Sequence, residues 1–187
     1  MIIRTVKLED AVELIELMRA LDEETKFMML EPGERQTTLE QQESQIITFS
    51  NSSSRVMYIA ENKGSLLGFV AGIGHSARRN KHSMYCIIGI KQIAAGQGLG
   101  TRLMIALEQW ARMHHFTRLE LTVMAHNERA KRLYLSRGFD IVIAPSPYNS
   151  VGRCFAIKCI ITLTTDELAE SSYGFICPIL SVLVGLV

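Results

Sequence analysis

The sequence predicts an α/β domain in which a mixed, mostly antiparallel central sheet is flanked by helices. Helix-type and strand-type patterns alternate along the chain, and three strand patterns follow one another between residues 56 and 90. The 187 residues are the size of one domain, and 48% of them are hydrophobic, which is enough for a sizeable core. We assign residues 1–163 to this domain and treat residues 164–187 as an apolar C-terminal tail.

Periodicity and turn residues give the order of the elements. Apolar residues recur at helical spacing from Ala11 to Leu21, and β-branched and aromatic runs bounded by Gly, Asn and Ser indicate strands. The expected elements are a strand at 1–6, helices at 11–21 and 35–49, strands at 56–61, 66–74 and 84–90, a helix at 99–110, a strand at 119–123, a helix from 127, and strands at 139–144 and 153–163. The strands at 84–90 and 119–123 should pair in parallel through a right-handed crossover.

Composition argues against several classes of protein. The chain has 20 Lys and Arg against 19 Asp and Glu, which gives a net charge of +1. Nucleic-acid-binding proteins are typically basic, so we expect no nucleic-acid partner. The N-terminus lacks a signal peptide, which predicts a cytoplasmic protein with reduced thiols. No metal site is expected, because the histidines include no HExxH pair and zinc spacing is absent from the four cysteines, Cys86, Cys154, Cys159 and Cys177.

The most informative stretch is the glycine loop, residues 95–101, which joins the strand at 84–90 to the next helix. Backbone N–H groups in the first turn of a helix lack partners, and the helix dipole adds partial positive charge there. Glycines, having no Cβ, let a ligand approach the backbone closely. Gly96, Gly98 and Gly100 therefore predict a phosphate cradle at the start of the helix.

The spacing of these glycines decides which kind of cradle is expected. A dinucleotide fingerprint needs Gly or Ala at position 101, and a P-loop needs Lys after its last glycine, but the chain has Thr101-Arg102. A second formal match, Gly72-Ile-Gly74-His-Ser-Ala77, is followed by RRNKHS, which cannot open an amphipathic helix. A nucleotide-binding oxidoreductase is therefore disfavoured.

Two motifs resemble those of the GNAT superfamily of N-acetyltransferases. Ile90 is followed after four residues by Ala95-Gly96-Gln97-Gly98-Leu99-Gly100, which is similar to that family's coenzyme A loop, (Gln/Arg)-x-x-Gly-x-(Gly/Ala). The segment Asn127-Glu-Arg-Ala130-Lys-Arg-Leu133-Tyr134-Leu-Ser-Arg-Gly138-Phe139 resembles the family's N-x-x-A-x-x-L-Y-x-x-x-G-F motif. Both occur in the family's order, with the strand at 119–123 between them, and the resemblance extends over residues 2–144.

The resemblance implies that acetyl-coenzyme A is the co-substrate, and it implies a role for each matching residue. Backbone groups of Ile88 and Ile90, on a splayed strand, would bond the pantetheine arm. Asn127 would help to hold the cofactor and is also suited to cap its own helix. Tyr134 would face the thioester and protonate the leaving thiolate. The pyrophosphate would bind the amides of Gly96, Gln97, Gly98, Leu99, Gly100 and Thr101.

The chain departs from the family pattern at Ala95, where the family usually has Gln or Arg. This change removes a side-chain contact to phosphate but no backbone amide, so we expect weaker binding rather than none. Arg102, on the first turn of the helix, is the candidate for compensation.

Other side chains allow a structural as well as a functional interpretation. Periodicity alone favours Tyr134 as a core residue, and only the resemblance favours catalysis. Glu120 is a candidate general base, although a surface carboxylate is the favoured interpretation, and His75 is an equally weak candidate. The basic connection is interpreted as a solvated hairpin end, with contact to an acidic substrate or cofactor phosphates as the alternative; it contains Arg78, Arg79, Lys81 and His82.

The resemblance implies direct acetyl transfer to a primary amine of a small molecule or protein within a ternary complex. The acceptor stays open among a polyamine, an aminoglycoside-like amine, an amino acid and a protein N-terminus. We expect the segment Asp22–Gly33 to line the acceptor site, with Glu23, Glu24 and Glu31 suited to a cationic amine. The alternative is a non-catalytic coenzyme A-binding or sensor domain, against which the presence of Tyr134 argues.

The apolar segment 173–187 is shorter than the ~20 residues that cross a bilayer, and Pro178 interrupts it, so we expect no membrane span. Packing on the domain, a homodimer contact and a membrane contact all stay open for it. From Ile143 onward the sequence no longer resembles the ending of the family.

Overall fold

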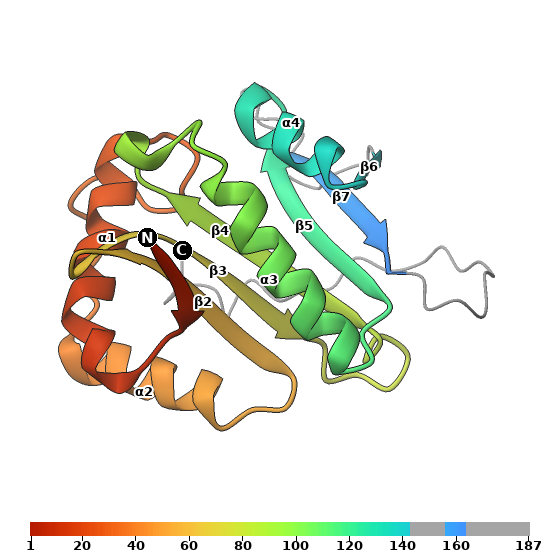
Figure 1. Cartoon of the computed structure of the whole chain (residues 1–187), viewed down its shortest axis with the longest axis horizontal. Coiled ribbons are helices and arrows are strands. Elements are labelled where there is room, and N and C mark those ends of the chain that lie inside the picture. Colours follow the sequence, from red (N-terminus) through yellow and green to blue (C-terminus); the bar gives the residue numbers. More distant parts are fainter. Residues whose placement is uncertain (143–155, 164–187) are drawn as a thin grey trace.

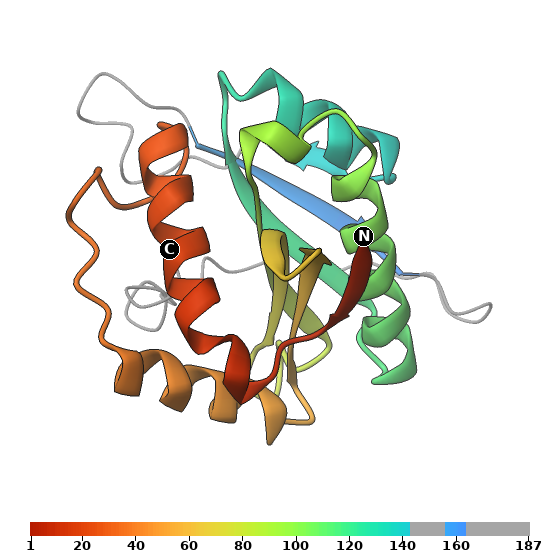
Figure 2. The ribbon, with the colours of Figure 1, turned by 60° about the vertical axis from the view of Figure 1, so that its left-hand side comes forward.

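The structure is a computed structural model that describes residues 1–142 and 156–163. These residues form a seven-stranded sheet with strand order β1-β2-β3-β4-β5-β7-β6, covered by helices on both faces (Figures 1 and 2). In chain order the elements are β1 (Ile2–Thr5), the 3-10 helix η1 (Leu8–Asp10), α1 (Ala11–Glu24), α2 (Leu39–Ser50), β2 (Arg55–Asn62), β3 (Ser65–Gly74), β4 (Ser83–Ile90), the 3-10 helix η2 (Gln92–Ala94), α3 (Leu99–Met113), β5 (Arg118–Met124), α4 (Glu128–Ser136), β6 (Asp140–Val142) and β7 (Ala156–Thr162).

The sheet confirms the prediction of a mixed, mostly antiparallel architecture. Neighbouring strands are antiparallel except β4 and β5, which pair in parallel because α3 carries the chain back across the sheet. Their ladder is short, and it ends at the pair Tyr85 and Glu120. Beyond it β4 stays paired with β3 as far as Ile90, while β5 pairs with β7 as far as Met124. The two strands therefore diverge toward the end of the sheet that carries the glycine loop (Figure 1).

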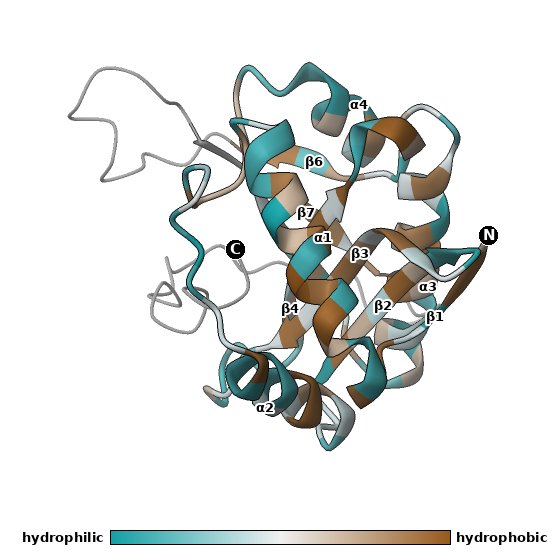
Figure 3. Ribbon diagram, turned by 90° about the vertical axis from the view of Figure 1, so that its left-hand side faces the viewer, coloured by the Kyte–Doolittle hydropathy of each residue, from teal (hydrophilic) through white to brown (hydrophobic). Residues whose placement is uncertain are grey.

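Each face of the sheet has its own hydrophobic core. In β2, Met57 and Ile59 pack toward α1 and α2, whereas Val56 and Ala60 pack toward α3, as the alternation of a strand requires. The strand β3 is hydrophobic along most of its length because both of its faces are covered (Figure 3).

The second helix begins later than the sequence predicted, at Leu39 instead of residue 35. Thr38 caps it: the Thr38 hydroxyl accepts from the Gln41 N–H at 3.2 Å, and the Gln41 side chain accepts from the Thr38 N–H at 3.0 Å. Arg35 is instead buried in a bidentate ion pair with Asp22 of α1, at 2.6 and 3.0 Å. This pair fastens the segment between α1 and α2 to the end of α1.

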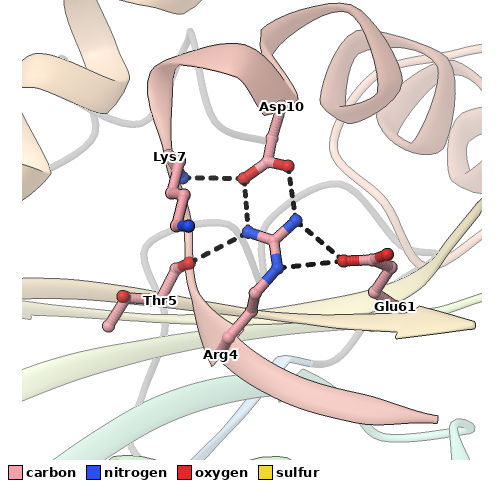
Figure 4. Close-up of polar contacts among 5 residues, drawn as sticks. All are labelled: Arg4, Thr5, Lys7, Asp10 and Glu61. Atoms are coloured by element: carbon pink, nitrogen blue, oxygen red, sulfur yellow. Dashed lines mark hydrogen bonds and ion pairs between the residues drawn. The ribbon is translucent and has the colours of Figure 1, made fainter. Parts of the chain in front are cut away.

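The start of α1 is held by a second ionic cluster (Figure 4). The Arg4 guanidinium donates to both carboxylate oxygens of Asp10 at 2.7 Å and to Glu61 of β2 at 2.9 Å. The Lys7 N–H donates to Asp10 Oδ2 at 2.7 Å. Hydrogen bonding from Arg4 lowers the pKa of Asp10, so the carboxylate stays charged and ties β1, β2 and α1 together.

The last two strands agree with the predicted strands at 139–144 and 153–163 over 140–142 and 156–162. Residues 139 and 163, at the ends of those predictions, lie just outside the two strands. Residues 143, 144 and 153–155 are outside the described residues, as are the expected loop 145–152, Cys154, Cys177 and the apolar tail. Within residues 1–142 and 156–163, no helix combines the length and the hydrophobicity that crossing a bilayer requires.

Candidate active site

The splayed part of β4 contains both residues that the sequence analysis assigned to the pantetheine arm. Ile88 and Ile90 follow the last β4–β5 pair, so neither is paired with β5. A strand edge without a neighbouring strand presents N–H and C=O groups that an extended ligand can bond like an added strand. The geometry thus allows the proposed backbone contacts.

The glycine loop turns the chain from β4 into α3 through two left-handed residues. Gly96 and Gly98 have φ of 80° and 74°, which side chains rarely tolerate. Gly98 immediately precedes α3 and supplies no side-chain cap. The Arg102 N–H donates to the Gly98 carbonyl at 3.1 Å and makes the first hydrogen bond of the helix. The N–H groups of Leu99–Thr101 precede it in the first turn, where no carbonyl of the helix lies within reach as an acceptor. These donors stand at the positive end of a 15-residue helix.

The glycines of this loop are not equivalent. A Cβ at Gly98 would meet no heavy atom within 4 Å, so the space beside it is open. A Cβ at Gly100 would lie 2.8 Å from the Leu133 side chain and 3.2 Å from that of Ile90. Gly98 therefore leaves its backbone accessible, whereas Gly100 lets α3 pack closely on β4 and α4. The formal match at Gly72 and Gly74 lies within β3 and opens no helix, as the sequence analysis expected.

A cation that the sequence analysis did not single out lies beside the loop. A Cβ built on Gly96 would be 3.4 Å from Nη2 of Arg129, which belongs to the first turn of α4. The expected substitute for the missing Gln or Arg at Ala95 was Arg102, which is exposed on α3. Arg129 is 33 positions from Gly96 in the chain, so only the packing of α4 against the loop reveals it.

The start of α4 agrees with the prediction that Asn127 caps its own helix. Its Oδ1 accepts from the Ala130 N–H at 3.1 Å. The capping bond uses the oxygen, which leaves the amide nitrogen of the side chain as a donor for a ligand.

Tyr134 is buried, with 6% of its surface exposed, and its ring lies 5.8 Å from that of Phe139. It belongs to the core on the α3 face, which agrees with the structural interpretation. Burial raises the pKa of the Tyr134 hydroxyl, so the group keeps its proton at neutral pH. A proton donor needs this protonation state.

Of the two candidate bases, Glu120 differs from expectation and His75 does not. Glu120 is buried, at 9% exposure, and its carboxylate lies 2.7 Å from Nε of Arg118, so the favoured interpretation as a surface carboxylate is wrong. His75 follows β3, and its N–H donates to the Ser83 carbonyl at the start of β4. That is the opposite end of β4 from the glycine loop. The basic connection 78–82 shares this remote end, which rules out its contact with phosphates held at the loop.

The segment Asp22–Gly33 lies across the splayed ends of β4 and β5. The Gln92 N–H donates to the Glu24 carboxylate at 2.7 Å, and the Gln92 side chain donates to the Glu24 carbonyl at 2.6 Å. Farther along, the ring of Phe27 lies 5.2 Å from that of His126, in the connection between β5 and α4. The segment therefore contacts both the strand end that leads into the glycine loop and the one that leads into α4.

The comparisons with known proteins agree with this geometry. The model of the Acetyltransferase (GNAT) family matches residues 15–139, well over half of the chain. The chain belongs to the GNAT acetyltransferase family. No curated protein matches the sequence significantly.

Several solved GNAT structures share the fold. An acetyltransferase of the GNAT family from Streptococcus pneumoniae is 24% identical, with a TM-score of 0.81 over 87% of this chain and 99% of the other. A putative acetyltransferase from Salmonella typhimurium, solved with its cofactor acetyl-CoA, is 16% identical, with a TM-score of 0.76 over 92% and 99%. A ribosomal-protein-alanine N-acetyltransferase from Brucella melitensis is 20% identical, with a TM-score of 0.73 over 87% and 100%. At these identities the likeness shows the fold.

Proposed function

We propose that this GNAT protein transfers an acetyl group from acetyl-coenzyme A to a primary amine by direct transfer in a ternary complex. The observation that carries the proposal is the uncapped start of α3 beside the splayed strands β4 and β5. Unused amide donors suit the pyrophosphate, and an unpaired strand edge suits the pantetheine arm. The Salmonella neighbour solved with acetyl-CoA supports the same co-substrate.

Three sets of groups would hold coenzyme A. The amides of residues 96–101 would bind the pyrophosphate, and the Arg129 guanidinium beside Gly96 would supply the cation that Ala95 cannot. Backbone groups of Ile88 and Ile90 would bond the pantetheine arm. The Asn127 side-chain nitrogen, not used in capping, would donate to the same ligand.

Acetyl-coenzyme A would supply an activated thioester, and the residues of the chain would position it and manage protons. An amide of β4 near Ile88 would polarise the carbonyl that the neutral amine attacks. As the carbon–nitrogen bond forms and the carbon–sulfur bond breaks, the Tyr134 hydroxyl would give its proton to the departing sulfur. Glu120 is held by Arg118, so a water chain is the better candidate to take the proton from the acceptor's ammonium group and leave the neutral amine that attacks.

The acceptor would approach from the α1–α2 face, beneath the segment Asp22–Gly33. Phe27 and Met29 are 40% and 47% exposed, and Glu23 and Glu31 are also exposed. Glu24, which the sequence analysis also offered to a cationic amine, is engaged by Gln92. A cationic amine with an apolar neighbouring group fits this combination of side chains.

An acetylation screen tests the proposal. The purified chain is incubated with acetyl-coenzyme A and panels of polyamines, aminoglycosides, amino acids and N-terminal peptides, and released thiol is measured. We expect amine-dependent thiol release with at least one panel. Tight binding of acetyl-coenzyme A in calorimetry without thiol release from any panel would support the sensor domain instead. A failure to bind acetyl-coenzyme A would contradict both.

A further inference from the structure

The end of the sheet opposite the glycine loop carries a surface that lies outside the site proposed above. Figure 1 shows it at the lower right, where α3 ends and β5 begins. α3 has 15 residues and so spans about 22 Å between the two ends. We call this surface the basic end, and it is formed by three connections with their flanking residues: 51–55, 75–82 and 112–118.

Hydrogen bonds and close packing join the three connections into one surface. The N–H groups of Thr117 and Arg118 donate to the His82 carbonyl at 3.0 and 3.2 Å. The Gly74 N–H donates to the Ser54 carbonyl at 2.7 Å, and a Cβ at Gly74 would lie 2.7 Å from the ring of Phe116. Segments that are distant in sequence therefore present their side chains together.

The basic end contains no Asp or Glu. Arg78, Arg79 and Lys81 are exposed, and none of them forms an ion pair with a carboxylate of the described residues. Further positive or titratable groups on the same surface are Arg112, His82, His114 and His115, all exposed. Most of the 19 acidic residues of the chain precede residue 44, and none lies between 62 and 107. The net charge of +1 therefore averages over an acidic region and a basic one.

A cavity of about 240 Å³ opens beside this surface. Arg55, Trp110 and His114 line it together with the hydroxyl-bearing residues Ser50 and Ser52. The rings of Trp110 and His114 are stacked, 3.7 Å apart and 14° from parallel. The cavity is smaller than the roughly 300–1,000 Å³ of drug-sized sites, so it suits one planar group rather than a whole cofactor.

We infer that the basic end binds a single-stranded nucleic acid, with backbone phosphates on Arg78, Arg79 and Lys81 and one nucleotide in the cavity beside Trp110. Guanidinium groups bind phosphate in a bidentate manner, and aromatic rings next to a cationic track are the usual platform for bases. An acidic protein would match the charge but not the aromatic cavity. A membrane surface would need exposed apolar groups, and Met113 is the large hydrophobic residue exposed at this end. The expectation of no nucleic-acid partner rested on the total charge, which hides this local surface.

The experiment uses the full chain and fluorescein-labelled 20-nucleotide oligo(U) and oligo(dT), measured by anisotropy. Three to four phosphate contacts predict that the logarithm of the association constant falls with the logarithm of the salt concentration with a slope of about −2 to −3. The affinity should therefore fall about 20- to 50-fold between 50 and 200 mM salt. Trp110 is the single tryptophan of the chain, so its fluorescence reports the cavity directly. We expect unlabelled oligonucleotide to quench it. Stronger binding of oligo(U) would indicate RNA, and stronger binding of oligo(dT) would indicate DNA.

Two triple variants, each of which removes three positive charges, test whether binding takes place at the basic end. The triple variant Arg78→Ser, Arg79→Ser, Lys81→Ser should weaken binding at least tenfold at 50 mM salt and reduce the slope by about 2. The matched control, Arg19→Ser, Lys26→Ser, Lys63→Asn, changes exposed cations elsewhere and should bind like the wild type. Equal losses in both variants would overturn the inference. So would the absence of binding at 50 mM salt, or equal binding and quenching by polyglutamate or by anionic lipid vesicles.

Discussion

Helices α3 and α4 pack against each other near the splayed strands, yet their first turns are built in opposite ways. α3 follows a left-handed Gly98 and has no side-chain cap, whereas α4 follows Asn127, whose side chain accepts one of the first N–H groups. An uncapped helix start costs stability unless a ligand satisfies it, and a capped start does not. The first turn of α3 therefore keeps amide donors to which an anion could bind, whereas the Asn127 side chain satisfies one of the first N–H groups of α4, the helix that contains Tyr134.

The largest effect should come from removing the hydroxyl that α4 supports. We expect Tyr134→Phe to lower kcat about 100-fold, because general acid catalysis is worth about 10²–10⁴-fold, while acetyl-coenzyme A affinity and melting temperature stay unchanged. Steady-state kinetics measures kcat, and calorimetry measures the affinity and the melting temperature. Tyr58→Phe in β2, a half-buried tyrosine outside the site, is the control. Full turnover of a folded Tyr134→Phe protein would assign the proton to water or another donor.

A change at the start of α3 should affect binding instead of turnover. Gly98→Val places a branched side chain in the open space beside the loop and should weaken acetyl-coenzyme A binding at least ~10-fold, about 1.4 kcal/mol. The same change strains a left-handed backbone, which costs stability by itself. Gly64→Val is the matched control, since Gly64 has φ of 83° and equally open surroundings in the β2–β3 turn. Equal affinity in the two folded variants would remove the loop from the site.

Substitutions of Asn127 should separate capping from ligand binding at the start of α4. Asn127→Ala removes the cap and should cost about 1 kcal/mol of unfolding free energy, comparable with Thr38→Ala at the start of α2. Asn127→Asp keeps a capping oxygen but loses the side-chain N–H donor and adds a negative charge. It should retain stability in urea unfolding and bind acetyl-coenzyme A more weakly. If Asn127→Asp binds like the wild type, Asn127 is only a cap.

The smallest effect concerns the residues just before α1, where the ionised carboxylate of Asp10 accepts hydrogen bonds from Arg4 and from the Lys7 N–H. Arg4 lowers the pKa of Asp10 in the folded chain, so this stabilisation is present above the unfolded pKa, near 3.8, and is lost as the pH falls through the folded pKa. Asp10→Asn should therefore be less stable than the wild type at pH 7, with the difference shrinking in acid. Unfolding free energies measured from pH 7 to 2 test this. A difference independent of pH would contradict the role of the charge.

Local sequence signals predicted the helix ends and the exposure of single side chains with uneven success. Asn127 and Gly138 were recognised because a cap and a left-handed stop depend on a few neighbouring residues, and the structure agrees at both. The start of α2 was misplaced by four residues because a buried partner, Asp22, holds Arg35 outside the helix. Glu120 was misread for a similar reason, since its burial and its pairing with Arg118 depend on the packing around β5.

The mixed α/β fold, the family motifs and the glycine loop could all be predicted from the amino-acid sequence, because they depend on periodicity, spacing and backbone conformation, which are local properties. The tertiary structure decided which groups meet at the loop and at the far end of the sheet. It brought Arg129 beside Gly96, reserved Gly100 for packing, and gathered three acid-free connections into one basic surface. Contacts of this kind depend on how helices and strands that are distant in sequence pack together, so no local sequence pattern predicts them.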